Sequence, residues 1–156
     1  MLNVVLFQPE IPHNTGAIGR LCLATRARLH LIKPLGFCLD DKQLKRAGLD
    51  YWQEVEVRVW EDWETLKKEI PAEAACWFIE CQGEKVYWEA DLRAAEEIYL
   101  VFGPETRGIP VSVMEPERCL RIPMEGTRSL NLATAAGIVM YEAVRQRSGG
   151  FMIYDL

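Results

Sequence analysis

A short segment near the start of the chain, PHNTGAIGRL at residues 12–21, places an amide, two glycines and a guanidinium in the first turns of an expected helix. Gly16 costs a helix interior about 1 kcal/mol relative to alanine. Gly16 and Arg20 are four residues apart and share one helix face. Asn14, at or just before the first turn, can cap free N–H groups and present its amide to the same place. We therefore expect Arg20 to extend across a glycine-lined hollow toward whatever binds at the helix start, the alternative being an ordinary exposed arginine.

A second candidate segment, VFGPETRGIP at residues 101–110, follows an apolar strand pattern. Gly103 permits a close approach to the backbone, and Pro104 stiffens the turn. The spacing of the two glycines is that of a phosphate-binding loop, but Ile109-Pro110 replaces the Lys-Ser/Thr pair that such a loop needs. This excludes the phosphate loop and leaves a tight turn with a surface Glu–Arg pair as the alternative to a binding loop.

A third candidate segment is RIPMEGTRSLNLATAAGIVMYEAV at residues 121–144. A strand pattern ends at Ile122-Pro123, and Ser129 and Asn131 precede a long apolar stretch. Either residue can serve as the N-cap of the last helix, and capping is compatible with a functional role.

The elements that must position these segments alternate between short apolar runs and helical patterns. This alternation predicts an α/β fold with a mostly parallel sheet, helices on both faces and a single domain over residues 1–156. In such sheets, ligands bind beyond the carboxyl ends of the strands. The expected strands are Leu2–Phe7, Arg28–Ile32, Val55–Val59, Ala75–Glu80, Ile98–Phe102 and Cys119–Ile122, and the expected helices are Thr15–Thr25, Asp40–Gly48, Glu61–Ile70, Asn131–Arg147 and, more weakly, Glu89–Glu97, with a turn at Pro110–Met114.

The composition is that of a globular protein, with 49% hydrophobic residues among 156. The longest early apolar run is Val4–Phe7, too short for a membrane span or a signal peptide. Five cysteines without a C-x-x-C pair and two distant histidines predict neither a disulfide framework nor a metal site, and they favour the cytoplasm.

The formal net charge is −5, but it is unevenly distributed. Residues 1–50 carry seven basic and four acidic side chains, whereas residues 51–100 carry five and thirteen. A basic face is therefore compatible with an acidic protein, and solvated helix faces are the alternative.

The last expected helix is apolar on nearly every side, Met140 and Val144 included. A small domain covers such a helix with its own sheet and, we expect, with a partner chain. The sequence thus favours a homodimer that packs through the C-terminal helix.

Taken together, the order N-x-G-x-x-x-R, then F-G-P-E-x-x-G, then R-I-P-M followed by S-L-N-L resembles the three motifs of the SPOUT class of RNA methyltransferases. The resemblance covers nearly the whole chain. The segments IPHNTGAIGRLCLATRARLHLIKPLGF, DDKQLKRAGLDYW and YEAVRQ are similar to the single-domain members that 2′-O-methylate the wobble nucleotide, cytidine(34) or uridine(34), of tRNA.

This resemblance implies a deep trefoil knot in the C-terminal part of the fold, a homodimer, and a metal-independent reaction with S-adenosylmethionine as methyl donor. It implies donor contacts at Ile79, Gly103, Glu105, Ile122, Ser129 and Leu130. It implies catalytic roles for Arg20, Asn14, Glu105 and Asn131. With tRNA as partner, we expect the basic contacts to come from Arg20, Arg26, Arg28, Lys42, Lys45, Arg46, Arg107 and Arg128.

Three other interpretations stay open at this point. The motifs hold the donor and do not name the nucleotide, so ribosomal RNA is an alternative substrate. A non-catalytic RNA-binding module with the same knotted fold is a second alternative, and a flavodoxin-like nucleotide-binding domain is a third.

Overall fold

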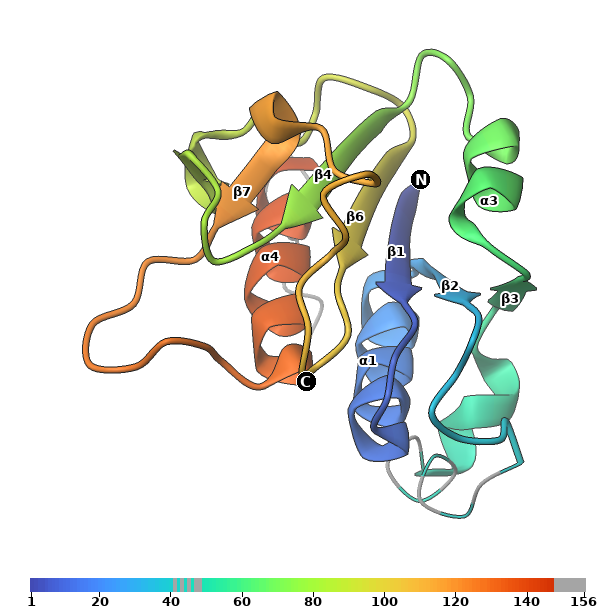
Figure 1. The fold of residues 1–156 in the computed structure, drawn as a ribbon. Coiled ribbons are helices and arrows are strands. Elements are labelled where there is room, and N and C mark those ends of the chain that lie inside the picture. Colours follow the sequence, from blue (N-terminus) through green and yellow to red (C-terminus); the bar gives the residue numbers. More distant parts are fainter. Residues whose placement is uncertain (41, 43, 45, 47–48, 148–156) are drawn as a thin grey trace, which may run out of the picture.

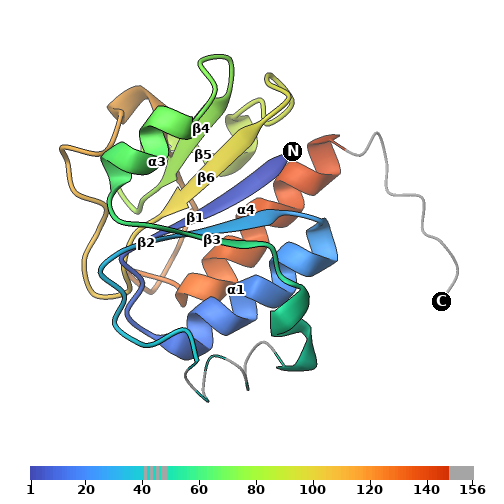
Figure 2. The same cartoon turned by 90° about the vertical axis from the view of Figure 1, so that its right-hand side faces the viewer.

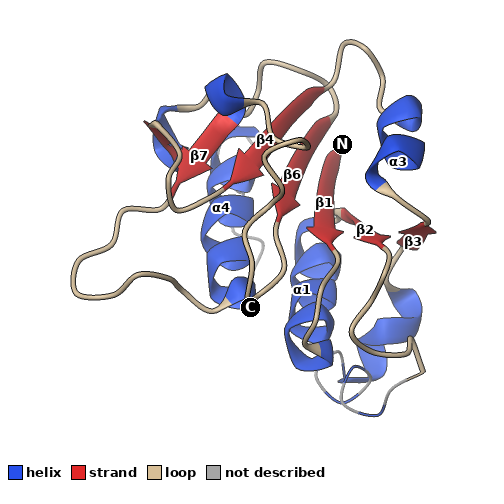
Figure 3. Ribbon diagram, viewed as in Figure 1, coloured by secondary structure: helices blue, strands red, loops and turns tan. Residues whose placement is uncertain are grey.

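The structure, a computed structural model, describes residues 1–156 except 41, 43, 45, 47–48 and 148–156. Seven strands form one sheet in the order β3-β2-β1-β6-β4-β7-β5, and every pairing is parallel (Figures 1 and 3). The strands are β1 (Leu2–Phe7), β2 (Arg28–Ile32), β3 (Val57–Trp60), β4 (Ala75–Ile79), β5 (Lys85–Val86), β6 (Ile98–Phe102) and β7 (Cys119–Arg121).

Helices cover both faces of this sheet, as the alternating pattern predicts. Helices α1 (Pro12–Thr25) and α4 (Leu132–Arg147) lie side by side on one face, and the short α3 (Trp63–Glu69) lies on the other (Figures 1 and 2). Strand β1 is buried along its whole length because it lies at the centre of the sheet with helices on both sides. The three short 3-10 helices are η1 (Leu49–Glu54), η2 (Tyr87–Glu89) and η3 (Pro116–Arg118).

Helix α1 begins three residues earlier than the sequence pattern predicts. Pro12 occupies its first turn, where a missing N–H is harmless and the fixed φ suits a helix. The N-cap is Ile11, which has no side-chain oxygen, so Asn14 lies inside the first turn and is 4% exposed. The expectation that Asn14 caps this helix is therefore wrong.

Both glycines of α1 are buried, and the hollow expected at Gly16 stays a prediction. At Gly19, an added Cβ would lie 2.6 Å from the Trp52 ring, so this glycine allows η1 to pack directly on α1. The contact brings Tyr51 of η1 to Arg20, whose guanidinium carbon lies 6.0 Å from the centre of the Tyr51 ring.

Helix α4 begins as predicted, with Asn131 as its cap. The Asn131 Oδ1 atom accepts hydrogen bonds from the Ala133 N–H at 2.9 Å and the Thr134 N–H at 3.2 Å. The two apolar residues Met140 and Val144 are only 0% and 8% exposed within this one chain, because α4 packs against both the sheet and α1. They are thus core residues, so substitutions at these positions would disturb the fold itself and would not test for a dimer.

The helix expected at Glu89–Glu97 does not form; the segment consists of the end of η2 followed by turns and bends. Its backbone groups are bonded instead by side chains from the end of α4. Arg147 donates to the carbonyl oxygens of Leu92, Ala95 and Glu96, and Gln146 bonds the Ala90 carbonyl and the Leu92 N–H. Hydrogen bonds to side chains about fifty residues away thus replace the local helical bonds that the sequence pattern predicts here.

Other boundaries move by one or two residues. Helix α3 starts after Asp62, whose Oδ1 accepts from the Thr65 N–H at 2.8 Å. The turn at Pro110–Met114 is confirmed, since the N–H groups of Val113 and Met114 both bond the Pro110 carbonyl. Much of the expected helix Asp40–Gly48 lies outside the described residues. The threading of the expected trefoil knot stays a prediction.

Two further findings concern membrane spans and disulfide bonds. No helix among the described residues is long and apolar enough to cross a membrane. All five cysteines are free thiols.

Candidate active site

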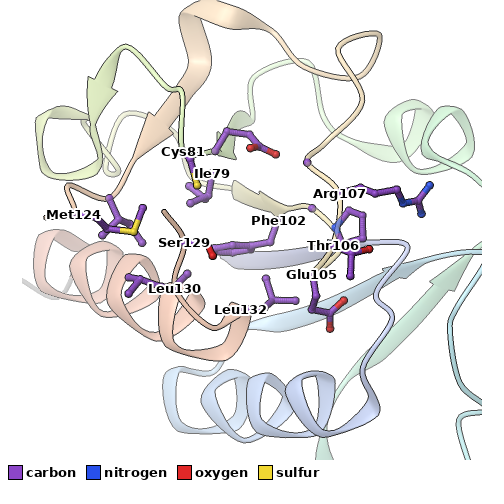
Figure 4. A pocket seen from close by; sticks show the side chains of 16 residues that line it. Ile79, Cys81, Phe102, Glu105, Thr106, Arg107, Met124, Ser129, Leu130 and Leu132 are labelled. Atoms are coloured by element: carbon purple, nitrogen blue, oxygen red, sulfur yellow. The ribbon is translucent and has the colours of Figure 1, made fainter. Parts of the chain in front are cut away.

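A cavity of about 340 Å³ lies at the carboxyl ends of β4, β6 and β7 (Figure 4). Its walls come from the loops that follow these strands and from the first turn of α4. Parallel strands bring these loops together although they are 20–50 residues apart in the chain. The lining residues are Ile79, Glu80, Cys81, Phe102, Gly103, Pro104, Glu105, Thr106, Arg107, Gly108, Ile122, Met124, Ser129, Leu130, Leu132 and Ala135.

All six residues expected to contact the donor lie around this one cavity. Apolar side chains form one wall, and Figure 4 shows Ile79, Leu130 and Leu132 around the space that Ser129 also lines. A volume of this size and a mostly apolar lining with a few polar groups are typical of a small-molecule site. Contact with a ligand stays a prediction for each residue.

Gly103 is required here by the loop itself. A Cβ at this position would lie 2.8 Å from the Ile109 nitrogen and 3.1 Å from the Gly108 carbonyl carbon. The only described glycine with a positive φ is Gly126, so backbone strain plays no part at Gly103. A larger residue would therefore displace the returning loop as well as any ligand.

Glu105 accepts hydrogen bonds from the N-terminus of α1. Its Oε2 atom accepts from the Glu10 N–H at 2.8 Å, and its Oε1 atom accepts from the Ile11 N–H at 3.0 Å and from the Asn14 amide at 3.2 Å. These backbone N–H groups precede a helix whose own N-cap offers no acceptor. A carboxylate at this end of a helix is also favoured by the helix dipole.

Asn14 joins Glu105 to the third motif. The Asn131 Nδ2 atom donates to the Asn14 Oδ1 atom at 2.9 Å, while Asn131 itself caps α4. A continuous chain of hydrogen bonds, which we name the Glu105–Asn14–Asn131 chain, thus links the N-termini of α1 and α4 beside the cavity. Three of the four residues expected to be catalytic are thus brought together, and a catalytic role stays a prediction for each of them.

A second set of hydrogen bonds links the loop after β6 to the loop after β1. Glu10 accepts from the Thr106 hydroxyl at 2.7 Å and from the Thr106 N–H at 3.2 Å. These hydrogen bonds, and then the nearby Arg107 charge, hold the pKa of the Glu10 carboxyl below its usual value. Arg107 in turn donates to the Gln8 side chain at 3.3 Å.

Arg20, the fourth expected catalytic residue, is exposed on α1 and is not part of the cavity lining. Asn14 does not hold it, because the Asn14 amide is bonded to Glu105 and Asn131. Among the described residues, no acidic side chain forms an ion pair with Arg20, whereas Arg28 is paired with Glu56. Its guanidinium lies over the Tyr51 ring, and its N–H donors are available to bind a further group.

The expected RNA contacts do not form one face. Arg107 and Arg128 lie at the carboxyl edge, and the exposed Lys42 and Arg46 follow β2. Arg26, at the end of α1, and Arg28, at the start of β2, lie at the opposite edge. Lys45 lies outside the described residues.

Sequence reasoning missed Glu80, which directly follows β4 and accepts a hydrogen bond from the Ile109 N–H. Only its place at a strand end could have pointed to it, because its partner is 29 residues away. Within the described residues, no group of three or more His, Cys, Asp and Glu side chains is arranged to hold a metal ion.

The chain is similar to known methyltransferases over nearly its whole length. A relative from Saccharophagus degradans, named tRNA (cytidine(34)-2′-O)-methyltransferase, is 49% identical over 152 residues, which cover 94% of this chain and 96% of the relative. A solved structure described as giving insights into the 2-OH methylation of C/U34 on tRNA has a TM-score of 0.91 at 46% identity, over 96% of this chain and 98% of its own.

A more distant structure shows a bound donor. The SpoU methyltransferase AviRb from Streptomyces viridochromogenes, in complex with S-adenosylmethionine, has a TM-score of 0.80 at 25% identity and covers 96% of this chain and 62% of its own. The model of the SpoU rRNA methylase family matches residues 1–141. The chain therefore belongs to the SpoU methylase family.

Proposed function

We propose that this protein is an RNA 2′-O-methyltransferase that takes its methyl group from S-adenosylmethionine and acts on the wobble nucleotide, C34 or U34, of tRNA. The observation that carries the proposal is the Glu105–Asn14–Asn131 chain, which fixes the start of α1 and the start of α4 beside one cavity. Family membership and the relative from Saccharophagus degradans, similar along its whole length, support the reaction and the substrate. A single domain over residues 1–156 would carry the whole activity.

The cavity suits this donor. Apolar side chains such as Ile79, Ile122 and Leu130 provide surfaces for an adenine ring, and the loop backbone near Gly103 and Ile122 can bond its polar edge. The bound donor supplies an electrophilic methyl group on a positively charged sulfur. The chain's own task is to hold that methyl group within reach of a ribose hydroxyl and to exclude competing water.

Arg20 is proposed to act on the RNA rather than on the donor. A guanidinium offers hydrogen-bond donors and no acceptor, so we assign Arg20 to binding negative charge rather than to removing the hydroxyl proton. Its guanidinium, which lies over the Tyr51 ring, would bind the phosphate beside the target ribose and stabilise the negative charge that develops on the attacking oxygen. The Glu105–Asn14–Asn131 chain would set the position of α1, and hence of Arg20, relative to the cavity.

The RNA surface would follow the carboxyl edge of the sheet. Arg107 and Arg128 stand beside the cavity, with Lys42 and Arg46 on the segment after β2. Arg26 and Arg28 at the far edge would contact only a more extended part of the RNA. Such a protein would work in the cytoplasm, where tRNA is modified.

A homodimer through α4 is also proposed. With Met140 and Val144 inside the core, the outer side of α4 offers Tyr141, which is 47% exposed. A partner chain seated there would bury the ring, so Tyr141→Glu should separate the dimer while the fold persists. Light scattering and circular dichroism would measure both properties, and a monomeric wild type at micromolar concentration would contradict the dimer.

The test of the proposed function is methyl transfer to defined RNA. The protein is incubated with S-adenosylmethionine and either bulk tRNA or ribosomal RNA, and the modified nucleotide is mapped by nuclease digestion and mass spectrometry. A 2′-O-methyl group at position 34 of tRNA is expected. Methylation of ribosomal RNA alone would overturn the tRNA assignment, and binding without transfer to either RNA would favour a non-catalytic module.

A further inference from the structure

One carboxylate in the cavity has no part in the Glu105–Asn14–Asn131 chain. Glu80 is half-buried at the end of β4 and lines the cavity beside Gly108. A Cβ on Gly108 would lie 3.1 Å from the Glu80 Oε1 atom and 3.3 Å from its Oε2 atom. The absence of a side chain at Gly108 thus makes room for this carboxylate in the wall.

The Glu80 carboxylate is held by one donor. The Ile109 N–H bonds its Oε1 atom, and no other described residue donates to it. Glu105, the other carboxylate of the lining, accepts three hydrogen bonds and faces the start of α1. Glu80 is therefore the acid whose charge is least compensated by the protein around it.

The only cation of the lining is Arg107, and its guanidinium donates to the Gln8 side chain. Two carboxylates and one guanidinium leave the cavity with an excess of negative charge. A site with that charge favours a cationic ligand over a neutral one of the same shape.

We infer that Glu80 makes the cavity selective for the positively charged methyl donor over the neutral product of the reaction. This inference rests on the proposed function. In the transfer, the ribose oxygen bonds the methyl carbon, the carbon–sulfur bond breaks with its electron pair on sulfur, and the hydroxyl proton passes to solvent. The donor carries a net charge of +1 because of its sulfonium, and S-adenosylhomocysteine carries none.

The attraction to Glu80 is therefore present before the transfer and absent after it. A cavity of about 340 Å³ is about 8 Å across, and at an effective dielectric constant of about 20–40 a pair of charges at that distance favours binding by about 5- to 30-fold. The loss of this attraction would help the product to leave.

Calorimetric titration of Glu80→Gln with both ligands tests the inference. The amide oxygen of glutamine can still accept from the Ile109 N–H, so the loop keeps its fastening. We expect the affinity for S-adenosylmethionine to fall by about 5- to 30-fold and that for S-adenosylhomocysteine to change less than about twofold. Glu84→Gln is the matched control, since Glu84 is exposed on the same loop and does not line the cavity.

A measurement on the wild type needs no variant. Between about 50 and about 500 mM salt, the donor should lose affinity more steeply than the product, since salt screens only the charged pair. Equal losses of both ligands in Glu80→Gln, or no change in their ratio, would overturn the inference and leave Glu80 as a fastening of the loop. A wild type that binds neither ligand would instead contradict the proposed function, and this inference with it.

Discussion

Two chains of hydrogen-bonded polar side chains accompany this sheet, and only one of them borders the cavity described above. At the carboxyl edge, the Glu105–Asn14–Asn131 chain borders a cavity. Trp60, His30, Asn3, Glu97 and Tyr99 form a second chain on the face that carries α3, from the end of β3 to the amino ends of β1 and β6. We name it the His30 chain.

The His30 chain is closed on itself. The Trp60 indole donates to His30 Nδ1 at 3.0 Å, so His30 Nε2 carries the proton that bonds Asn3 Oδ1 at 3.1 Å. Asn3 donates to Glu97 at 3.3 Å, and the Tyr99 hydroxyl donates to the same carboxylate at 3.1 Å. His30 and Asn3 are only 1% and 0% exposed, and neither lines the cavity at the carboxyl ends of the strands.

The difference shows which buried polar clusters indicate a site. Both chains satisfy their own hydrogen bonds, as buried polar groups must. The Glu105–Asn14–Asn131 chain joins the N-termini of two helices and borders the cavity, whose other carboxylate, Glu80, is held by a single N–H. The His30 chain, in contrast, is a means of holding β1, β2 and β6 in register.

The largest effect is expected at Arg20, outside both chains. Arg20→Ala should lower the rate of methyl transfer at saturating tRNA by about 10²–10³-fold, because a preorganised charge is lost. Arg20→Lys should restore tRNA binding better than rate, since an ammonium lacks the planar fork of donors. Single-turnover kinetics measure both. Arg93→Ala, at the amino edge, is the control, and a rate for Arg20→Ala within about threefold of wild type would remove Arg20 from the mechanism.

Acid should destabilise the protein through the His30 chain. Burial, and then the charges of Arg28 and Arg58, lower the pKa of His30 to about 4 in the folded protein from 6.5. The unfolded chain therefore binds a proton on His30 more readily between these values, so the free energy of unfolding should fall by about 3 kcal/mol as the pH drops from 6.5 to 4.

Urea unfolding across this range checks the acid prediction. His30→Gln should flatten the dependence on pH, whereas His13→Gln, at an exposed position on α1, should leave it as in wild type. An unchanged slope in His30→Gln would show that His30 is not buried as a neutral side chain.

The smallest expected effect is on the salt dependence of tRNA binding, which should differ between a basic residue at the carboxyl edge of the sheet and one at the amino edge. Arg128→Gln should reduce the magnitude of the log–log salt slope of tRNA binding by about 0.7, the contribution of one phosphate contact on a single strand. Filter-binding titrations at several salt concentrations measure this slope. The same substitution at Arg93, at the amino edge, should not alter it; equal effects at both positions would assign the slope to overall charge.

The sequence predicts most of the strands well, because a short apolar run is a local pattern that does not depend on distant partners. It also predicts that Gly103, Ile122 and Ser129 lie near each other, because parallel strands end at a common edge. It fails where partners are remote. The start of α1 depends on Glu105, about 94 residues away, and the missing helix at Glu89–Glu97 depends on Arg147. Strand β5 has two residues and is too short to show a pattern.

The placement of the basic residues was predictable in principle. Helix α1 runs antiparallel to the strands it follows, so Arg26 at its end must lie at the amino edge, and Arg28 must begin the next strand there. Charge counted along the sequence does not contain this information, whereas the order of elements does. Glu80, by contrast, is recognised only from the fold, because its partner Ile109 is 29 residues away in the sequence.

Hydrogen–deuterium exchange with and without S-adenosylmethionine tests most directly which end of the sheet is the site. The amides of Glu10, Ile11, Ile109, Ala133 and Thr134 are bonded by the side chains that border the cavity. We predict that the donor slows exchange in the peptides that contain them and leaves β2 and β3, around the His30 chain, unchanged. Protection confined to β2 and β3, or no protection at the cavity loops at saturating donor, would contradict the account.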